Sequence, residues 1–306
     1  MIRSRGPGEP DPLILRAVDL TLDLGQRPWL MGIVNASPDS FSDGGRNTTL
    51  EAQLRLASEH LAAGADIIDI GGESASTGSP PVAVEQEIER VAPLIERVAG
   101  ELGALVSVDT YKPDVARAAI AAGARIVNDV SGLRDGDLAG VCAETGAALV
   151  VMHTRAVPRR RLQDPDLYPA IVAEVLDFLR SRMELARLAG VAPEQLIVDP
   201  GPDFSKTPAQ TIALLCEVER LHELGRPILM AISRKDFIGA LTRRAPGERL
   251  AGTLAALAHG VDAGAQIFRV HDVSAAADFL RIRAALRGDG EPSRDLALTE
   301  ELRYDR

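Results

Sequence analysis

Polar and charged residues follow every short apolar run of this sequence. The full set is Asn35, Asp69, Glu73, Asp109, Asn128, Asp129, His153, Asp199, Ser233, Arg234, Lys235, Arg269, His271 and Asp272. A single Asp in such a place is most often a helix cap or a loop residue. A set that recurs after every run instead predicts one shared site, where carboxylates and amides bind a planar heterocycle rich in N–H donors and cations bind an anionic group.

The apolar runs have the length and composition of buried β-strands. They are rich in Val, Ile and Leu, as parallel strands covered on both faces require. The eight runs span residues 29–34, 67–70, 105–108, 126–128, 148–152, 196–198, 228–232 and 266–270. Eight strands in one chain with no linker between them favour a closed sheet.

Helix-length segments separate these runs. Residues 50–66, 85–102 and 170–191 carry apolar residues at i, i+3, i+4 and i+7, as crossover helices do. Four segments end in Ala-Gly-Ala or Ala-Gly-Val just before a strand, where Gly suits the left-handed helix end. The sequence therefore predicts an α/β fold, a single (β/α)₈ TIM barrel over 15–287, between a flexible N-terminal arm (1–14) and a flexible C-terminal tail (288–306). In such a barrel the residues after the strands share one mouth.

Composition excludes several classes of protein. The net charge of −10, with no polybasic stripe, argues against a nucleic-acid or anionic-membrane surface. The first 12 residues lack the apolar core of a signal peptide, so we expect a cytoplasmic protein. Cys142 and Cys216 match no metal or redox spacing, and we expect both to be core thiols.

Several of these residues lie in motifs that resemble dihydropteroate synthase. The motifs are MGIVNASPDSFSDGG, GADIIDIGGES, VSVDTYKPDV, IVNDVSGL, VMH, IVDPG, ISRKDFIG and IFRVHDV, in this order and spacing from about residue 28 to 286. The resemblance implies the barrel fold. It also implies that 4-aminobenzoate attacks the methylene of 6-hydroxymethyl-7,8-dihydropterin diphosphate and expels pyrophosphate.

The resemblance implies a role for each matching residue. Asp199 would accept two hydrogen bonds from the pterin edge, Asn128 would complete ring recognition, and Lys235 would donate to its carbonyl or N5 side. Asp109 would stabilise positive charge as the leaving group departs. Met152 and Phe204 would contact the ring faces, although Met152 is also an ordinary core residue by type.

The leaving group has its own matching residues. Arg269 and His271 correspond to diphosphate ligands, and Asn35 to a ligand of the diphosphate or its Mg²⁺. Two alternatives stay open: His271 and Asp272 form a structural pair, and the Arg159–Arg161 run is a solvated loop rather than a source of positive field at the mouth.

The chain departs from the family where the second substrate binds. Ala75, Ser76 and Thr77 replace the family's Thr, Arg and Pro, and Asp203 and Ser205 replace two glycines. Asp236 replaces a serine that contacts the aminobenzoate carboxylate. Two like charges about 4 Å apart repel by roughly 4 kcal/mol at an effective dielectric of about 20, unless a proton, a cation or an outward rotamer relieves them.

Three functions therefore remain from the sequence. The first is a synthase with an altered second-substrate pocket. The second is a paralogue that transfers the pterin to another amine. The third is a non-catalytic pterin-binding or partner-binding protein, or a relative that handles a methylated folate. The resemblance also implies a homodimer through barrel helices, for which the apolar segment GTLAALAHGVDAG is suited.

Overall fold

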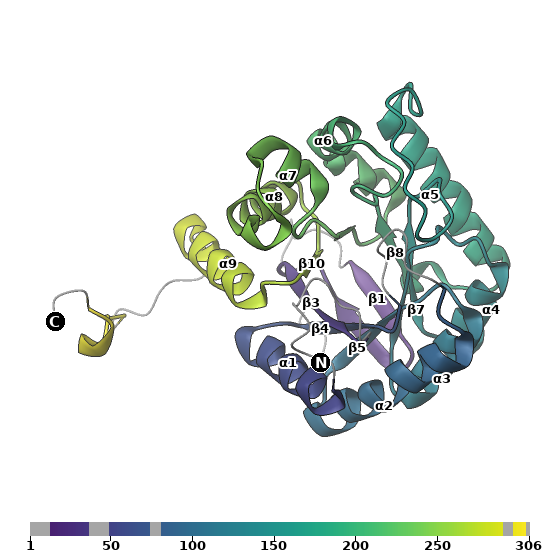
Figure 1. Ribbon diagram of the computed structural model, residues 1–306, viewed down its shortest axis with the longest axis horizontal. Helices are drawn as coiled ribbons and strands as arrows, with labels where there is room; N and C mark the ends of the chain where they lie inside the picture. Colours follow the sequence, from purple (N-terminus) through teal and green to yellow (C-terminus); the bar gives the residue numbers. More distant parts are fainter. Residues whose placement is uncertain (1–12, 37–48, 74–80, 290–295, 304–306) are drawn as a thin grey trace, which may run out of the picture.

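The structure is a computed structural model that describes residues 13–36, 49–73, 81–289 and 296–303. A parallel sheet occupies its centre, with a ring of helices outside it (Figure 1). The strands, in the order of the sheet, are β8 (Leu196–Asp199), β7 (Ala148–Met152), β6 (Ile126–Asp129), β5 (Leu105–Asp109), β4 (Ile67–Gly71), β3 (Trp29–Asn35), β10 (Ile267–Val270) and β9 (Leu229–Met230).

The two outer strands of this order meet, so the sheet closes. Val198 of β8 forms a parallel bridge with Ile228, which directly precedes β9. Val198 N also donates to Pro227 O at 2.9 Å. The eight strands coincide with the eight predicted runs, and the predicted TIM barrel is confirmed.

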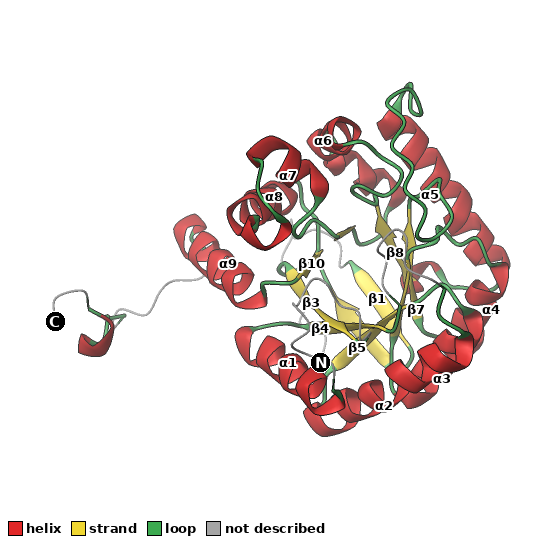
Figure 2. Ribbon diagram, viewed as in Figure 1, coloured by secondary structure: helices red, strands yellow, loops and turns green. Residues whose placement is uncertain are grey.

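Helices follow the strands and cover the outside of the barrel (Figure 2). They are α1 (Leu50–Ala63), α2 (Val84–Leu102), α3 (Pro113–Ala122), α4 (Gly136–Thr145), α5 (Ile171–Leu188), α6 (Pro208–Cys216), α7 (Asp236–Thr242), α8 (Leu250–Asp262) and α9 (Val273–Arg287). The predicted glycine ends are present, since Gly64, Gly123, Gly190 and Gly264 all have positive φ. Short 3₁₀ turns cover Pro193–Gln195, Val218–Leu224, Pro246–Glu248 and Glu300–Leu302.

A hairpin that the sequence analysis did not anticipate precedes the barrel. Its strands β1 (Ile14–Ala17) and β2 (Leu20–Asp23) pair antiparallel, and each has only four residues. Leu15, Ala17 and Leu24 are buried against inward-facing residues of the barrel strands. The hairpin therefore closes the barrel interior at one end. Of the predicted arm, residues 1–12 lie outside the described residues.

One prediction about the cysteines is wrong. Cys142 is buried in α4, but Cys216 is exposed. Cys216 is the last residue of α6, and the apolar face of that helix is formed by Leu214 and Leu215, which are buried. A helix-like context alone does not say which face a residue occupies.

Candidate functional site

The alternation of strand side chains selects which polar residues face the barrel interior. An apolar layer of inward-facing residues includes Met31, Ile67, Ile126, Ile197 and Ile267. Because every second residue of a strand points the same way, the next inward positions follow at steps of two. These positions are held by Asn35, Asp69, Asp109, Asn128, Met152, Asp199 and Arg269. The polar site is therefore the last layer of the barrel core.

Residues of the opposite alternation support loops. Asp129 accepts the backbone N–H of Ser131 at 2.8 Å and that of Leu133, so it shapes the turn after β6. Asp272 forms an ion pair with Arg234, with Nη2 2.7 Å from Oδ1. Asp272 is therefore the partner of Arg234, whereas His271 Nδ1 lies 3.0 Å from Ser233 Oγ. The surrounding protein lowers the pKa of His271 to about 3, mainly through burial, with Arg269 and Arg234 adding to the effect.

Arg269 joins two carboxylates across the interior. Its Nε donates to Asp69 at 2.6 Å and its Nη2 to Asp109 at 2.9 Å. Asn128 Nδ2 lies 3.3 Å from the same Asp69 oxygen. Burial raises the pKa of Asp109 to about 7, with Arg269 opposing the shift and the charge of Asp69 adding to it. Asp69, which belongs to the polar set predicted to share one site but was assigned no role in the reaction, is fully buried and holds Asn128 and Arg269 in one network.

Asp199 lies at the end of β8 beside a cationic group. Its Oδ1 accepts the backbone N–H of Gly201 at 2.7 Å. Burial raises the pKa of Asp199 to about 6, while that hydrogen bond and the positive charge of Lys235 oppose the shift. The Lys235 ammonium lies 4.4 Å from the centre of the Phe204 ring, a cation–π contact, and burial lowers the pKa of Lys235. Asp199 thus remains a hydrogen-bond acceptor at neutral pH.

A buried lysine fixes the loop after β8. Lys206 Nζ donates to Gly201 O at 2.8 Å and to Phe204 O at 3.0 Å, and lies 2.8 Å from His153 Nδ1. Burial lowers the pKa of Lys206 to about 7 and that of His153 to about 2. Gly201 has φ +64°, and a Cβ there would lie 2.1 Å from His153 O, so only glycine fits. These contacts set the positions of Phe204 and Asp199.

The two acidic residues of the altered pocket both have partners within the protein. Asp203 Oδ1 accepts the Thr211 hydroxyl at 3.1 Å, and Oδ2 accepts the backbone N–H of Asp236 at the start of α7. Asp236 is more than half exposed, and its Oδ1 lies 3.3 Å from Arg249 Nη1. Both carboxylates are thus balanced by a helix N–H, a hydroxyl or a guanidinium.

A cavity of about 220 Å³ opens beside this network. Asp109, Phe204 and Lys235 belong to both, whereas Asn128, Asp199 and Arg269 are not part of the cavity wall. The rest of the described wall is Glu73, Glu87, Thr110, Tyr111, Val130, Thr154, Ala156, Val157, Pro158, Arg159, Arg160, Arg161, Leu162, Gln163, Asp203, Ser205 and Asp236. Ala75, Ser76 and Thr77 lie outside the described residues.

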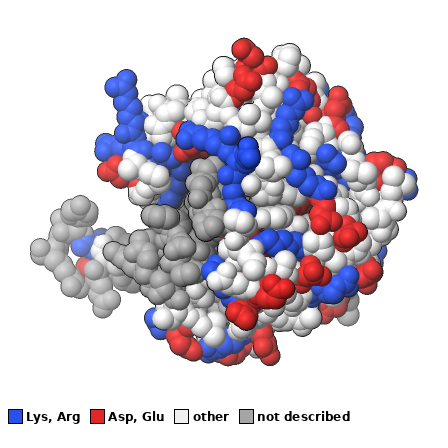
Figure 3. Space-filling view, turned by 45° about the vertical axis from the view of Figure 1, so that its right-hand side comes forward, with Lys and Arg blue, Asp and Glu red and all other residues white. Residues whose placement is uncertain are grey.

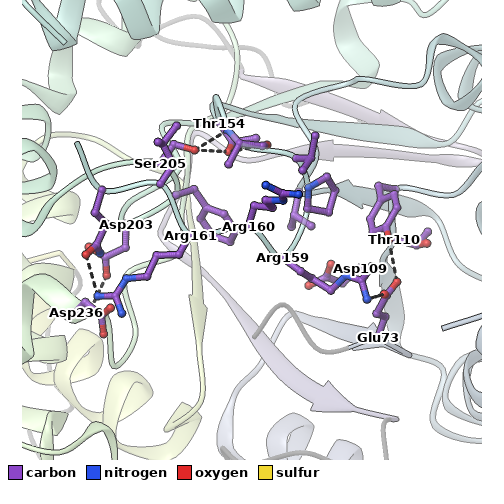
Figure 4. A pocket seen from close by; sticks show the side chains of 18 of the residues that line it. Glu73, Asp109, Thr110, Thr154, Arg159, Arg160, Arg161, Asp203, Ser205 and Asp236 are labelled. Carbon is purple, nitrogen blue, oxygen red and sulfur yellow. Dashed lines mark hydrogen bonds and ion pairs between the residues drawn. The ribbon is translucent and has the colours of Figure 1, made fainter. Parts of the chain in front are cut away.

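The arginine run is part of this wall, so the prediction of a solvated loop is wrong for Arg159. Arg159 Nη1 lies 2.7 Å from Glu73 Oε1, which also accepts from Val82 N. Arg160 and Arg161 are exposed but also line the cavity. Figure 4 shows the three arginines in a row between Glu73 on one side and Asp203 and Asp236 on the other. The sequence showed the run but not the loop path that brings it to the mouth.

Comparison with known proteins gives a consistent result. The family described as Pterin binding enzyme matches residues 31–271. The dihydropteroate synthase of Synechocystis sp. is 41% identical over 266 residues, which cover 86% of this chain and 92% of that protein. A structure of Xanthomonas albilineans dihydropteroate synthase with 4-aminobenzoic acid has a TM-score of 0.83 at 42% identity and covers 90% of this chain and 99% of that one. Another, in complex with 7,8-dihydropteroate, has a TM-score of 0.78 at 42% identity, with 89% and 98% covered.

Proposed function

The chain belongs to the dihydropteroate synthase family of pterin binding enzymes, and from this premise we propose how its residues divide the reaction among them. It condenses 6-hydroxymethyl-7,8-dihydropterin diphosphate with 4-aminobenzoate and releases pyrophosphate, a transferase reaction of folate biosynthesis. The amine nitrogen attacks the methylene carbon, the C–O bond to the diphosphate breaks with its electron pair, and the amine loses a proton. The residues must therefore hold the ring, the leaving group and the amine in line.

We assign the pterin ring to the inward-facing layer at the barrel mouth. Asp199 would accept two parallel hydrogen bonds from the amidine-like edge, and Asn128 would both donate and accept. Lys235 would donate to the carbonyl or N5 side, with Phe204 and Met152 against the ring faces. This assignment rests on the buried Asp199 carboxylate at the mouth. The positive charge of the nearby Lys235 opposes the rise in its pKa and so favours the ionised form.

Asp109 and Arg269 would serve the bond that breaks. Asp109 lies at the edge shared by the network and the cavity, where its negative charge would stabilise positive charge on the methylene. Arg269 uses two of its five N–H donors on Asp69 and Asp109 in the described part of the chain, which leaves others for a diphosphate oxygen. His271, which is neutral at pH 7, would donate a hydrogen bond to the diphosphate without adding a positive charge.

The donor set suits a magnesium ion only together with the substrate. Among the described residues no group of three His, Cys, Asp or Glu side chains is arranged to hold a metal. Mg²⁺ commonly keeps one or two protein oxygens and takes the rest from phosphate and water. The Asn35 amide oxygen, at the end of β3, would be its protein ligand, and the ion would neutralise charge on the leaving diphosphate.

The cavity beside Asp109, Phe204 and Lys235 would receive the amine. It is adjacent to the proposed position of the methylene, and its acidic residues Asp203 and Asp236 are balanced within the protein. The repulsion of a second-substrate carboxylate by Asp236 is therefore weaker than the sequence suggested, because Arg249 screens that charge. This removes the main objection to 4-aminobenzoate that the sequence raised.

We also propose that the barrel over 15–287 acts in the cytoplasm, as a homodimer and without a nucleic-acid partner. Both cysteines are free, as is usual in a reducing compartment. Among the described helices none is long and apolar enough to cross a membrane. On the face drawn in Figure 3, Lys and Arg are interspersed with Asp and Glu rather than gathered into one basic field.

Pyrophosphate release tests the assignment. The protein with Mg²⁺ and the dihydropterin diphosphate should release pyrophosphate only when 4-aminobenzoate is added, and Asp199→Ala should abolish release and pterin binding together. Asp177→Ala, an exposed carboxylate on α5, is the matched control. Tight pterin binding by the wild type without any amine-dependent release would contradict the synthase and leave a pterin-binding protein.

A further inference from the structure

The carboxylate of the second substrate needs a cation, and most charges of the cavity wall are already paired. Among the described residues, Glu73 lies 2.8 Å from Lys112 Nζ as well as near Arg159, and the buried Glu87 lies 2.6 Å from the same ammonium. Asp109 is paired with Arg269, and Asp236 with Arg249. These four acids thus have cationic partners of their own, and Asp203, the other acid of the described wall, accepts hydrogen bonds from the Thr211 hydroxyl and the Asp236 N–H.

Two guanidinium groups of the wall remain. Arg160 and Arg161 form no ion pair with any residue of the described part of the chain, and Arg161 Nη2 donates to the neutral Gln163 Oε1 at 2.8 Å. Both side chains are exposed at the rim of the cavity. The segment 74–80, which follows β4 in the sequence, contains no Lys or Arg. Lys235 of the described wall also forms no ion pair with another described residue, but it contacts the Phe204 ring and is assigned to the pterin. The loop after β7 is thus the remaining source of positive charge for a carboxylate in the described wall.

Hydrogen bonds join the loop after β7 to the loop after β8. The buried Ser205 hydroxyl lies 3.0 Å from Thr154 Oγ1 and accepts the backbone N–H of Arg155 at 3.1 Å and of Ala156 at 2.7 Å. Figure 4 shows this junction above the arginine row. Arg160 N also donates to Val157 O at 3.1 Å, which tightens the turn. The backbone that carries both arginines is therefore held against the cavity.

We propose that Arg160 and Arg161 form the carboxylate-binding end of the second-substrate pocket and select an anionic amine. The inference rests on the proposed function, since it assumes that the amine enters this cavity. A carboxylate beside a guanidinium forms charge-assisted hydrogen bonds, which a neutral analogue of the same shape cannot match. Discrimination between 4-aminobenzoate and 4-aminobenzamide therefore depends on these two side chains, whereas pterin binding does not.

Steady-state kinetics of R160Q/R161Q tests this with two amines. The KM for 4-aminobenzoate should rise roughly 10- to 100-fold, as expected for loss of hydrogen bonds between charged groups. The KM for 4-aminobenzamide and the calorimetric Kd for the pterin diphosphate should change less than about threefold, and R160K/R161K should recover part of the loss. The matched control R187Q/R220Q removes two exposed arginines of α5 and the 218–224 turn and should behave as the wild type.

The other outcomes overturn the proposal. An unchanged KM for 4-aminobenzoate would do so, as would an equal rise for both amines or a parallel loss of pterin affinity. If the wild type releases no pyrophosphate, calorimetric binding of 4-aminobenzoate to the pterin diphosphate complex replaces the KM. If 4-aminobenzoate binds the wild type but binds R160Q/R161Q more weakly, the arginine site is supported although the synthase function fails. If 4-aminobenzoate does not bind the wild type, both the arginine site and the synthase function are overturned.

Discussion

At the residue scale, the site depends on carboxylates kept near the balance between their ionised and neutral forms. Burial raises the pKa of Asp199 to about 6 and that of Asp109 to about 7, well above the usual value of an Asp. A ligand that donates hydrogen bonds to an ionised carboxylate regains part of the free energy lost on burial. Binding of a ring rich in N–H donors therefore stabilises the ionised form of these carboxylates.

Pterin affinity should therefore fall on acidification. Below about pH 6 the unliganded Asp199 is increasingly protonated, and a proton must leave before it can accept two N–H bonds. We expect the Kd for the pterin diphosphate to rise about tenfold per pH unit well below that pKa, because one proton is released on binding. Calorimetry from pH 5 to 8 measures this.

Asp199→Asn is the matched variant for this pH profile. An amide cannot accept in both positions and does not titrate, so its affinity should be weak and should lack the acid limb that belongs to Asp199. Any remaining slope near pH 7 would belong to Asp109. A wild-type affinity that stays constant down to pH 5 would contradict this account of the pH dependence.

The sequence indicated these residues because they follow the apolar runs, and the alternation of strand side chains explains which of them face inward. Asn35, Asp109 and Asp199 were recognised as strand-end residues, and the same alternation separates Asn128, which faces inward, from Asp129, which supports a turn. Asp69 belongs to the same polar set, but the resemblance assigned it no role. A count in steps of two from Ile67 places it on the inward face, where it contacts Arg269 and Asn128.

At the element scale, the altered loop after β8 keeps a glycine-like backbone while adding side-chain contacts. Asp203 and Ser205 have φ of +66° and +54°, in the region that favours glycine, and both stand where the resembling family has glycine. Each side chain forms a contact that glycine lacks, to α7 in one case and to the loop after β7 in the other. These contacts join three loops, and strand patterning does not predict them because they form only between loops distant in sequence.

Ser205→Gly removes the hydroxyl contacts to the loop after β7 and also relieves the left-handed backbone at residue 205. Glycine relieves the left-handed backbone, commonly by about 1 kcal/mol, which offsets part of the lost hydrogen bonds, so the melting temperature should change little. The loop that carries Arg160 and Arg161 loses its fastening, and we expect the KM for 4-aminobenzoate to rise severalfold with an unchanged pterin Kd. Kinetics and calorimetry on one preparation measure both.

Ser205→Ala is the control for this variant. It keeps the strained backbone and leaves the N–H groups of Arg155 and Ala156 without their acceptor, so it should lower the free energy of unfolding by about 1 to 3 kcal/mol. If Ser205→Gly is as destabilised as Ser205→Ala, backbone strain at this residue is negligible. An unchanged KM in both variants would mean that the hydroxyl does not position the arginines.

At the scale of the whole molecule, apolar side chains are exposed on the helices that end the barrel. Leu241 of α7, Ile282 of α9 and Leu286 of α9 are 70%, 61% and 84% exposed. Helices α7, α8 and α9 are neighbours on one side of the barrel in Figure 1. Ile282 and Leu286 are one helical turn apart and share a face of α9. Exposed large aliphatic residues that lie side by side favour an interface, because water contact with apolar surface is unfavourable.

We therefore predict that I282D/L286D converts a homodimer into a monomer. Light scattering should give the wild type twice the 32.5 kDa chain mass and the variant a single chain mass. Each subunit would have to bury two unpaired carboxylates in the interface, and their desolvation would outweigh the free energy of association. Leu188→Asp, at a residue 68% exposed on α5, is the control and should remain a dimer. Because the barrel mouth is built from the strand ends of one chain, the monomer should keep its pterin affinity. A monomeric wild type would contradict the dimer, whereas a monomeric variant that also loses pterin binding would show that the second chain supports the mouth.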